Sequence, residues 1–408
     1  MSDLSLTARN GARSASINFD YITLILVASI LLLGLIMVTS SSMSIASKNG
    51  DHAFLFLQRQ LLTVLLGIFF ASLIFNLRTE LLDKFAMPLL GFAVFLLVLV
   101  LIPGVGHKVN GSQRWLQFLG LNIQVSEIVR VLALIFIASY SVRREAELRS
   151  SLMGLLKPLL MLTICFFLLL LEPDLGAAIV LMITGFGVLF IAGARLRDVI
   201  GLAGIFSSLV LLAIVLEPYR MKRLTTFLNP WADPFNSGFQ LTQSLIAIGR
   251  GGWTGVGLGE SVQKLFYLPE AHTDFLFAVL SEELGLFGIL LTIGLFIALA
   301  GRALYIAKLA ADSGLKFQSY LAVGFGIWIA LQSLINIGVN MGALPTKGLT
   351  LPLMSYGRSS LLVTLAWIGL LLRVYHEAVY AMRGPAAAAL RSGAARTGGI
   401  EKSEAVQS

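Results

Sequence analysis

The segment Tyr267–Gly285, YLPEAHTDFLFAVLSEELG, places a carboxylate, Asp274, where a polar loop meets an apolar run. If the helix of that run begins near Thr273, Asp274 lies in its first turn, where the positive end of the helix dipole stabilises a carboxylate. An aspartate at that position can simply cap the helix. It can also act as a general base at the boundary between an apolar layer and water. Position alone leaves both interpretations open.

Basic residues could meet this acid. Arg220, Lys222 and Arg223 follow an apolar run in EPYRMKRL, and Lys347 precedes the last apolar run. Arginine can hold a phosphate through two parallel hydrogen bonds, and lysine can act as a point charge. These residues therefore suit a phosphate or pyrophosphate. Arginine and lysine at an interface also reach lipid headgroups without a specific role, so this alternative stays open.

The elements that must position these side chains are membrane helices. Of 408 residues, 57% are hydrophobic and 13% are charged, whereas soluble domains average roughly 45–50% and about 25%. The apolar residues form runs of about twenty, which is long enough to cross about 30 Å of hydrocarbon. Spans are helical because lipid offers no partners for free backbone groups. We predict an all-α polytopic membrane protein with ten transmembrane helices, at Tyr21–Ser40, Phe54–Phe75, Phe85–Ile102, Asn122–Ser141, Leu156–Leu171, Gly176–Ala192, Val199–Leu216, Thr273–Ala300, Tyr320–Met341 and Leu353–Tyr375.

The short loops predict the orientation. Alternate loops are rich in arginine and lysine, and the opposite short loops carry far fewer. Because positive loops stay in the cytoplasm, residues 1–20 and 376–408 are predicted to be cytoplasmic tails, the second one disordered. Residues 21–375 are predicted to form the membrane domain, with a large extracytoplasmic loop, residues 217–272, between helices 7 and 8. The net charge of +8 then reflects orientation and attraction to anionic lipid rather than nucleic-acid binding.

Two further segments mix apolar and polar residues. In GFQLTQSLIAIGRGG, Gln243 and its polar neighbours separate apolar side chains, which fits either a half-helix facing a cavity or a re-entrant packing segment. In GALPTKGLTLPLMSYGRSSLLV, Ser355 and Arg358 enter the last span beside prolines and glycines. Broken, polar backbone at membrane depth persists only against protein or water. This favours a cavity wall over a simple kink.

Other ionisable residues have simpler interpretations. Glu127 and Arg130, in IQVSEIVRV, can pair on one helix as a structural salt bridge or as an ion pair lining a cavity. The adjacent acids Glu282–Glu283 are expected to be structural. Asp233 in WADP is the second candidate acid, better explained as a turn residue before its proline. Cys165 is the only cysteine, which excludes a disulfide framework and a thiolate metal site, and the four histidines show no ligand spacing.

Taken in order, these motifs resemble the SEDS family of bacterial cell-wall proteins. The resemblance rests on NPWADPFNSGFQLTQSLIAIGRGGWTGVGLGESVQKLFYLPEAHTDFLFAVLSEELGLFG and LPTKGLTLPLMSYG, and it runs from about Asp20 to Tyr375. PEAHTD and PTKGLTLP resemble the division branch of the family more than the elongation branch. The resemblance implies ten spans, cytoplasmic termini and a peptidoglycan glycosyltransferase that polymerises lipid II at the division septum of the inner membrane.

The resemblance also implies residue roles. The essential acid of the family corresponds to Asp274, and its intramembrane pair corresponds to Glu127 and Arg130, where lysine usually fills the second position. Arg358 stands where the family commonly has glycine. Inversion at a sugar carbon needs one base, here Asp274, while cations stabilise the departing undecaprenyl pyrophosphate. The expected substrate-binding residues are Arg220, Arg223, Lys347, Gln243 and Ser355.

The implied partners are lipid II, the growing lipid-linked glycan and a class B penicillin-binding protein, an FtsI-like transpeptidase. Other membrane proteins of the division machinery, like FtsQ, FtsL and FtsB, are also expected, and nucleic acid is not. A divalent cation, Mg²⁺ or Mn²⁺, is expected to assist, without identified ligands, and no organic cofactor is expected. Two other functions stay open. A lipid II flippase would depend most on Glu127 and Arg130, and a non-catalytic scaffold for the transpeptidase would tolerate Asp274→Asn.

Overall fold

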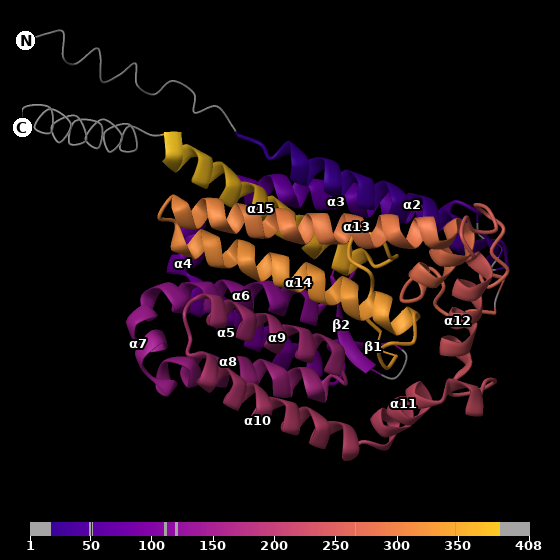
Figure 1. Cartoon of the computed structure of the whole chain (residues 1–408), viewed down its shortest axis with the longest axis horizontal. Coiled ribbons are helices and arrows are strands. Elements are labelled where there is room, and N and C mark those ends of the chain that lie inside the picture. The colour runs from indigo at the N-terminus through magenta and orange to yellow at the C-terminus, as the bar shows by residue number, and fades with distance from the viewer. Residues whose placement is uncertain are drawn as a thin grey trace, which may run out of the picture.

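The computed structural model describes residues 18–48, 50, 52–109, 112–118, 121–265, 267–346 and 348–383. Its long helices lie side by side along one axis, and the connecting segments gather at both ends (Figure 1). The predicted fold class, a helical polytopic membrane protein, is confirmed, because eight described helices are long and apolar enough to cross a membrane. They are α2 (Tyr21–Lys48), α3 (Leu55–Phe75), α6 (Val125–Arg143), α8 (Leu152–Leu171), α10 (Leu196–Val215), α13 (Leu276–Asp312), α14 (Lys316–Asn340) and α15 (Arg358–Arg383).

Two shorter apolar helices, α5 (Ala86–Leu101) and α9 (Leu175–Ile191), occupy the remaining predicted spans. They have 16 and 17 residues, against the roughly 20 that a crossing usually needs. The number of ten crossings therefore stays a prediction. The described chain enters α2 and leaves α15 at the same end of the bundle (Figure 1), as an even number of crossings requires.

Several predicted boundaries differ from the structure, among them the end of α2, which lies at Lys48 rather than Ser40, and the start of α15, which lies at Arg358 rather than Leu353. The eighth helix, α13, begins at Leu276 rather than Thr273 and continues to Asp312, well beyond the predicted end at Ala300. The last helix, α15, continues through Arg383, so the first residues of the predicted C-terminal tail are helical. The predicted ends follow the apolar runs alone, whereas α13 and α15 continue into neighbouring polar residues. The rest of that tail and residues 1–17 lie outside the described residues.

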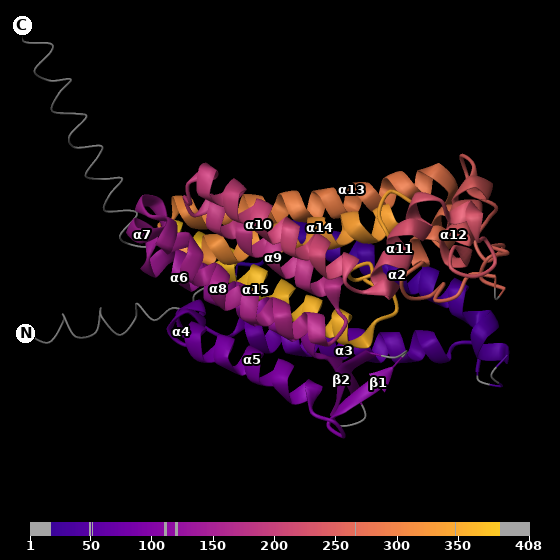
Figure 2. The same ribbon diagram turned by 90° about the horizontal axis from the view of Figure 1, so that it is seen from below.

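A small sheet departs from the all-α prediction. Strands β1 (Gly106–Val109), β2 (Ser112–Phe118) and β3 (Leu121–Gln124) form an antiparallel sheet in the order β1-β2-β3. It lies beside α5, at the end of the bundle that also carries α11 (Pro218–Leu228) and α12 (Phe239–Gly251) (Figures 1 and 2). The predicted fourth span is therefore wrong at its start, since its first residues, from Asn122, belong to β3. The sheet places Arg114, in the middle of β2, next to the loop after α8.

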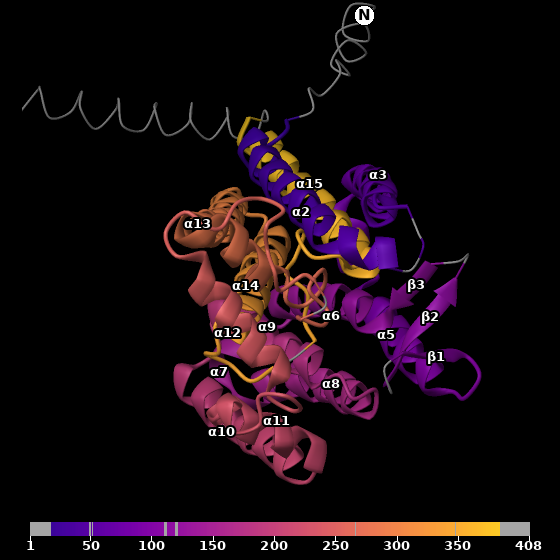
Figure 3. The ribbon, with the colours of Figure 1, turned by 90° about the vertical axis from the view of Figure 1, so that its right-hand side faces the viewer.

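The long segment between α10 and α13 is largely helical. It contains α11 (Pro218–Leu228), the 3-10 helix η1 (Pro230–Ala232) and α12 (Phe239–Gly251). Helix α12 packs against α13 and α14 and buries Leu241 and Ala247, while Ile246 and Arg250 are exposed. Figure 3 shows α12 and α11 at the end of the bundle that faces the viewer. At the opposite end lie two short helices, α4 (Thr79–Lys84) and α7 (Glu145–Ser150).

Helix α13 is broken once, at Gly285. This residue has φ 62° and ψ −157°, a conformation that only glycine adopts without strain. The loop after α12 takes up the hydrogen bonds that the break releases, since the N–H groups of Val256 and Gly257 donate to the carbonyls of Glu282 and Glu283. A Cβ on Gly285 would lie 2.3 Å from the backbone nitrogen of Gly255. The kink therefore has an identifiable cause, a glycine with a loop inserted beside it.

The substitution Gly285→Ala should destabilise the protein, because it adds backbone strain of about 1–3 kcal/mol to a direct clash with the loop. Thermal unfolding in detergent should show a lower Tm. The matched control is Gly294→Ala in the same helix, where an added Cβ meets nothing within 4 Å. Equal Tm values for the two variants would contradict this account of the kink.

Candidate functional site

Asp274 lies in the turn immediately before α13, not within the helix. The N-cap residue is Phe275, no side chain forms a cap hydrogen bond there, and the first turn holds no acidic residue. The capping interpretation of Asp274 therefore fails. Its half-buried carboxylate instead lies against the last loop, since a Cβ on Gly348 would be 3.2 Å from Asp274 Oδ2.

Charges from distant parts of the chain act on this carboxyl. Burial raises the pKa of Asp274 to about 7, and the negative charges of Glu270 and Asp174 raise the pKa further, while the cations Arg223 and Arg114 lower it. Arg223 belongs to α11, Arg114 to β2, and Asp174 is the N-cap residue of α9. The fold therefore brings three separate segments around one acid that titrates near neutral pH, which suits a general base.

The predicted cations take different positions. Arg223 lies close enough to influence Asp274 and is held by two contacts: its Nη1 donates to the carbonyl of Thr346, 3.1 Å away, and its guanidinium lies over the ring of Tyr219, 4.6 Å from the centroid. These contacts fix a cation beside the last loop. Lys347, the next residue of that loop, lies outside the described residues.

Arg220 points toward helix ends. Its Nη1 donates to the carbonyl of Ala213 at 2.9 Å and its Nη2 to that of Leu170 at 3.5 Å. Both carbonyls belong to the last turns of helices, where backbone acceptors have no intrahelical donor. The arginine thereby ties α11 to α10 and α8, and its role toward a pyrophosphate stays a prediction.

The other predicted site residues lie nearby in the fold. Gln243 is half-buried on α12, two turns before the loop that contacts the α13 kink. Ser355 is buried, and its Oγ accepts a hydrogen bond from the N–H of Leu351 at 3.0 Å, so it closes the turn before α15. Arg358 begins α15, and its buried Nε has no hydrogen-bond partner within the described part of the chain. Substrate contacts of these three residues stay predictions.

Two acidic residues after α8, Glu172 and Asp174, were not predicted to belong to the site. Arg114 Nε donates to the carbonyl of Glu172 at 3.1 Å, and Arg114 Nη1 lies 3.9 Å from Asp174 Oδ2. The Glu172 side chain is fully buried, and neither carboxylate oxygen has a partner among the residues described. Burial, with the charge of Asp174 added, raises the pKa of Glu172 to about 9, against the opposing effect of Arg114. The sequence signal was EPD directly after an apolar run.

The predicted intramembrane pair is present. Arg130 forms a salt bridge with Glu127 on α6, and both side chains are buried. Arg130 Nη1 also donates to Gln332 Oε1 on α14 at 2.5 Å, and its guanidinium lies 5.7 Å from the Trp328 ring centroid. The pair therefore joins two helices in the core. This geometry agrees with the structural interpretation and adds a partner, Gln332, that the sequence did not indicate.

The acids Glu282 and Glu283 have the expected structural role. Glu282 accepts hydrogen bonds from the N–H groups of Val262 and Gln263, and it forms an ion pair with Arg250. Glu283 pairs with the buried Lys264 at 2.9 Å. Together these two carboxylates fasten the loop after α12 onto α13.

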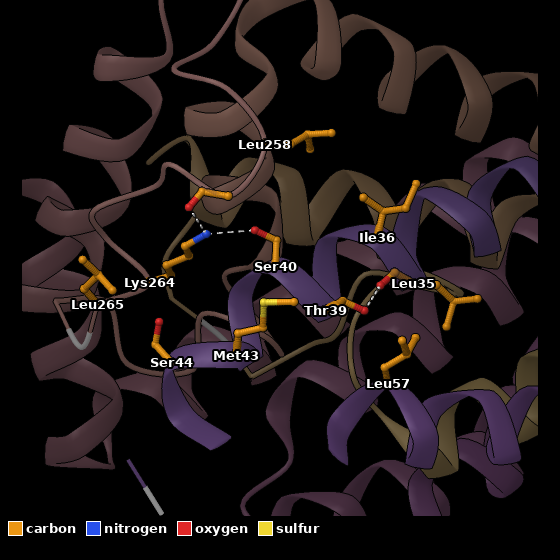
Figure 4. A pocket seen from close by; sticks show the side chains of 11 residues that line it. Leu35, Ile36, Thr39, Ser40, Met43, Ser44, Leu57, Leu258, Lys264 and Leu265 are labelled. Carbon is orange, nitrogen blue, oxygen red and sulfur yellow. Dashed lines mark hydrogen bonds between the residues drawn. The ribbon is translucent and has the colours of Figure 1, made fainter. Parts of the chain in front are cut away.

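A cavity of about 570 Å³ lies beside the Lys264–Glu283 ion pair, between α2, α3 and the loop after α12 (Figure 4). Its lining is mostly apolar, with Lys264 Nζ donating to Ser40 Oγ at 3.0 Å along one wall. Asp274 is not among its lining residues.

The second candidate acid, Asp233, lies in a turn. Asp233 accepts hydrogen bonds from Asn236 Nδ2 and from the N–H and Oγ of Ser237, which is the turn geometry expected before a proline. Among the described residues, no group of three or more His, Cys, Asp or Glu side chains could hold a metal ion. The expected Mg²⁺ or Mn²⁺ stays a prediction, because Mg²⁺ is often held by only one or two carboxylates together with substrate phosphates.

Comparison with known proteins decides the family. The FtsW/RodA/SpoVE family, described as cell cycle proteins, matches residues 21–380. The chain belongs to this family. Its members include a probable peptidoglycan glycosyltransferase FtsW of Thioalkalivibrio sulfidiphilus, 54% identical over 86% of this chain and 88% of that protein. A protein of the same name in Methylococcus capsulatus is 49% identical over 93% of this chain and 98% of its own length. The resemblance seen in the motifs is confirmed.

Solved structures show the same FtsW/RodA/SpoVE fold. One comes from a study of the structural coordination of polymerization and crosslinking by a peptidoglycan synthase complex. It has a TM-score of 0.72 and 33% identity, and covers 89% of this chain and 99% of that chain. The rod shape determining protein RodA of Thermus thermophilus has a TM-score of 0.66 and 30% identity, over 89% and 98% of the two chains.

Removing one partner of the Glu127–Arg130 pair should destabilise this family member strongly. Glu127→Leu leaves a buried guanidinium without its carboxylate, which typically costs about 3–5 kcal/mol. The double variant Glu127→Leu/Arg130→Leu removes both charges and should unfold at a higher temperature than Glu127→Leu alone. Thermal unfolding in detergent checks this order, and the reverse order would contradict a mainly structural pair.

Proposed function

We propose that this chain is a peptidoglycan glycosyltransferase that polymerises lipid II during septal cell-wall synthesis, with Asp274 as its general base. The observation that carries the proposal is the Asp274 carboxyl itself. It stands outside α13, against Gly348 and within reach of the charges of Arg223 and Arg114, with a pKa of about 7. The names of the relatives, probable peptidoglycan glycosyltransferases, support the same activity.

The proposed step needs one base and no acid. The acceptor sugar transfers its hydroxyl proton to the Asp274 carboxylate while the hydroxyl oxygen attacks the anomeric carbon of the donor sugar. The bond from that carbon to the lipid pyrophosphate breaks, and the pyrophosphate leaves with both bonding electrons. Fixed cations stabilise the charge that develops on it, and Arg223 is placed for this role. Inverting hydrolysis of a glycoside differs, because its poorer leaving group needs a second carboxyl.

Membership of the family supports a proposal for the setting of the reaction. The chain is a multi-pass membrane protein, and we place it in the bacterial inner membrane at the division septum, with both termini in the cytoplasm and α12 on the periplasmic side. A class B penicillin-binding protein is the proposed partner, in line with the peptidoglycan synthase complex of the structural relative. FtsQ-, FtsL- and FtsB-like proteins are further proposed partners. A divalent cation, Mg²⁺ or Mn²⁺, is proposed to accompany the reaction.

Replacing the base should abolish polymerisation while the protein stays folded. Asp274→Asn keeps the shape of the side chain but cannot accept the proton, so the rate should fall about 10²–10⁴-fold, the usual contribution of a general base. The assay contains the purified chain, its class B partner from the same organism, lipid II and a divalent cation, with glycan strands resolved on a gel. Asp233→Asn is the matched control and should retain activity, because Asp233 only closes a turn.

Full-length strands from Asp274→Asn would show that the assigned base is wrong and would favour a scaffold. Movement of lipid II across vesicles by the wild-type chain, without any strand formation, would favour a flippase.

The rate should also depend on pH near neutrality. Only the ionised Asp274 can accept a proton, so kcat/KM should rise tenfold per pH unit below about 7 and level off above it. Glu270→Gln removes a negative charge that raises the pKa of Asp274, so its acidic limb should lie at lower pH. Initial rates between about pH 5 and 8.5 measure both. A flat profile in the wild type would exclude Asp274 as a base with this pKa.

A further inference from the structure

Two buried amides of α14 hold the backbone of the turn that carries Asp274. Asn336 and Asn340 lie one helical turn apart and are 2% and 0% exposed. The Nδ2 atoms of both donate to the carbonyl oxygen of Asp274, at 2.9 and 3.0 Å. Because a carbonyl only accepts, the NH₂ group of each amide must face it. Polar side chains buried inside a membrane helix bundle are costly and are usually retained for a role.

Asn340 occupies the place of a backbone hydrogen bond. The carbonyl of Asp274 and the N–H of Ala278 are four residues apart, the spacing of partners in an α-helix. Here Asn340 lies between them, since its Oδ1 accepts from the Ala278 N–H at 3.1 Å while its Nδ2 donates to Asp274. The helix therefore begins at Leu276. Without this side chain the two backbone groups could pair directly and draw Asp274 into the helix.

Asn336 ties the same turn to the last loop. Its Nδ2 donates to the carbonyl of Leu349 at 2.6 Å as well as to that of Asp274. Leu349 follows Gly348, whose backbone lies beside the Asp274 carboxylate. Ser244 of α12 adds a third segment, because its Oγ donates to the carbonyl of Asn340 at 2.8 Å. The two amides thus fix Asp274 relative to both neighbouring segments.

We propose that Asn336 and Asn340 are positioning residues that hold the Asp274 carboxyl outside α13 and against Gly348, where it can take the proton of the acceptor sugar. The inference rests on the proposed function, because it assigns these amides to the orientation of that base. They do not touch the reacting atoms. A purely structural role for them would lower stability and leave the pH dependence of the chemistry unchanged.

Kinetics of Asn336→Leu and Asn340→Leu test the proposal. Displacing the base should lower kcat about 100-fold, with KM for lipid II changed less than about threefold, because misplacement by about 1 Å has effects of this size. The acidic limb of the pH profile should move below the wild-type value, since a carboxylate drawn into the first turn of the helix is stabilised by the helix dipole. The charges acting on the carboxyl, those of Glu270, Arg223, Arg114 and Asp174, are all retained.

The matched control is Ser333→Ala on the same helix. Ser333 is buried like the two asparagines, but its Oγ donates only to the carbonyls of Ile329 and Ala330 in its own helix. It should keep the wild-type kcat and pH profile. The comparison separates loss of a buried polar group in α14 from loss of the contacts to Asp274.

A cross-linking measurement is independent of activity. In a Cys165→Ala background, the pair Asp274→Cys and Gly348→Cys reports how closely the two positions lie, through the rate of disulfide formation with a mild oxidant. The rate should fall at least about tenfold when Asn336→Leu or Asn340→Leu is added, because the turn is then free to leave its place. Ser333→Ala should leave the rate unchanged.

The outcomes separate the inference from the function on which it rests. Inactive Asp274→Asn together with wild-type kcat, acidic limb and cross-linking in both asparagine variants would overturn the positioning role alone. Active Asp274→Asn would overturn the proposed base and the positioning role with it. If a leucine variant fails to fold, Asn336→Ser or Asn340→Ser replaces it. Serine has a shorter side chain with a hydroxyl group, and the same changes in kcat, pH profile and cross-linking rate are expected of it.

Discussion

The structure depends on one constraint, that irregular backbone at membrane depth needs hydrogen-bond partners other than water. The last loop and the turn before α13 are both irregular, and three carbonyls within them are satisfied by one row of amides on α14. Gln332 donates to Thr350, Asn336 to Leu349 and Asp274, and Asn340 to Asp274. These amides are four residues apart, so they share one face of the helix. The side chains of one regular helix, α14, therefore hold the last loop and the turn before α13 in place.

The same row connects the candidate site with the deep ion pair. Gln332 uses its two ends differently, donating to the last loop and accepting from Arg130. The Glu127–Arg130 pair is thus linked to the segment beside Asp274 through hydrogen bonds alone. The contacts of Arg130 with Glu127 and Gln332 fix α14 against α6.

The sequence predicted the apolar helices and the candidate base, which depend on composition and on local motifs. It did not predict contacts between residues that are far apart in the chain. Apolar runs located the eight long and two shorter apolar helices of the described residues, and the motif around Asp274 located the candidate base. The start of α13 was misplaced because the Asn340 side chain, far along the chain, replaces a backbone bond there. Asn336 was missed although Gln332, Asn336 and Asn340 recur every four residues within a predicted span. That spacing predicts a shared helix face, but it does not say which carbonyls of other segments the amides meet. The sheet that places Arg114 near Glu172 lies between α5 and α6, in a segment without strand-like alternation.

The charges around Asp274 also suggest how the base strengthens when substrate binds. Burial, Glu270 and Asp174 favour the protonated acid, and Arg223 and Arg114 oppose them, which leaves a pKa near 7. A donor pyrophosphate that engages Arg223 would offset the positive charge that lowers this pKa. The bound state would then hold a more basic carboxylate than the free protein, because an interacting charge changes the balance between the two protonation states. The proposed leaving-group cation, Arg223, and the proposed base, Asp274, would therefore be coupled, since the charge of Arg223 acts on the pKa of Asp274.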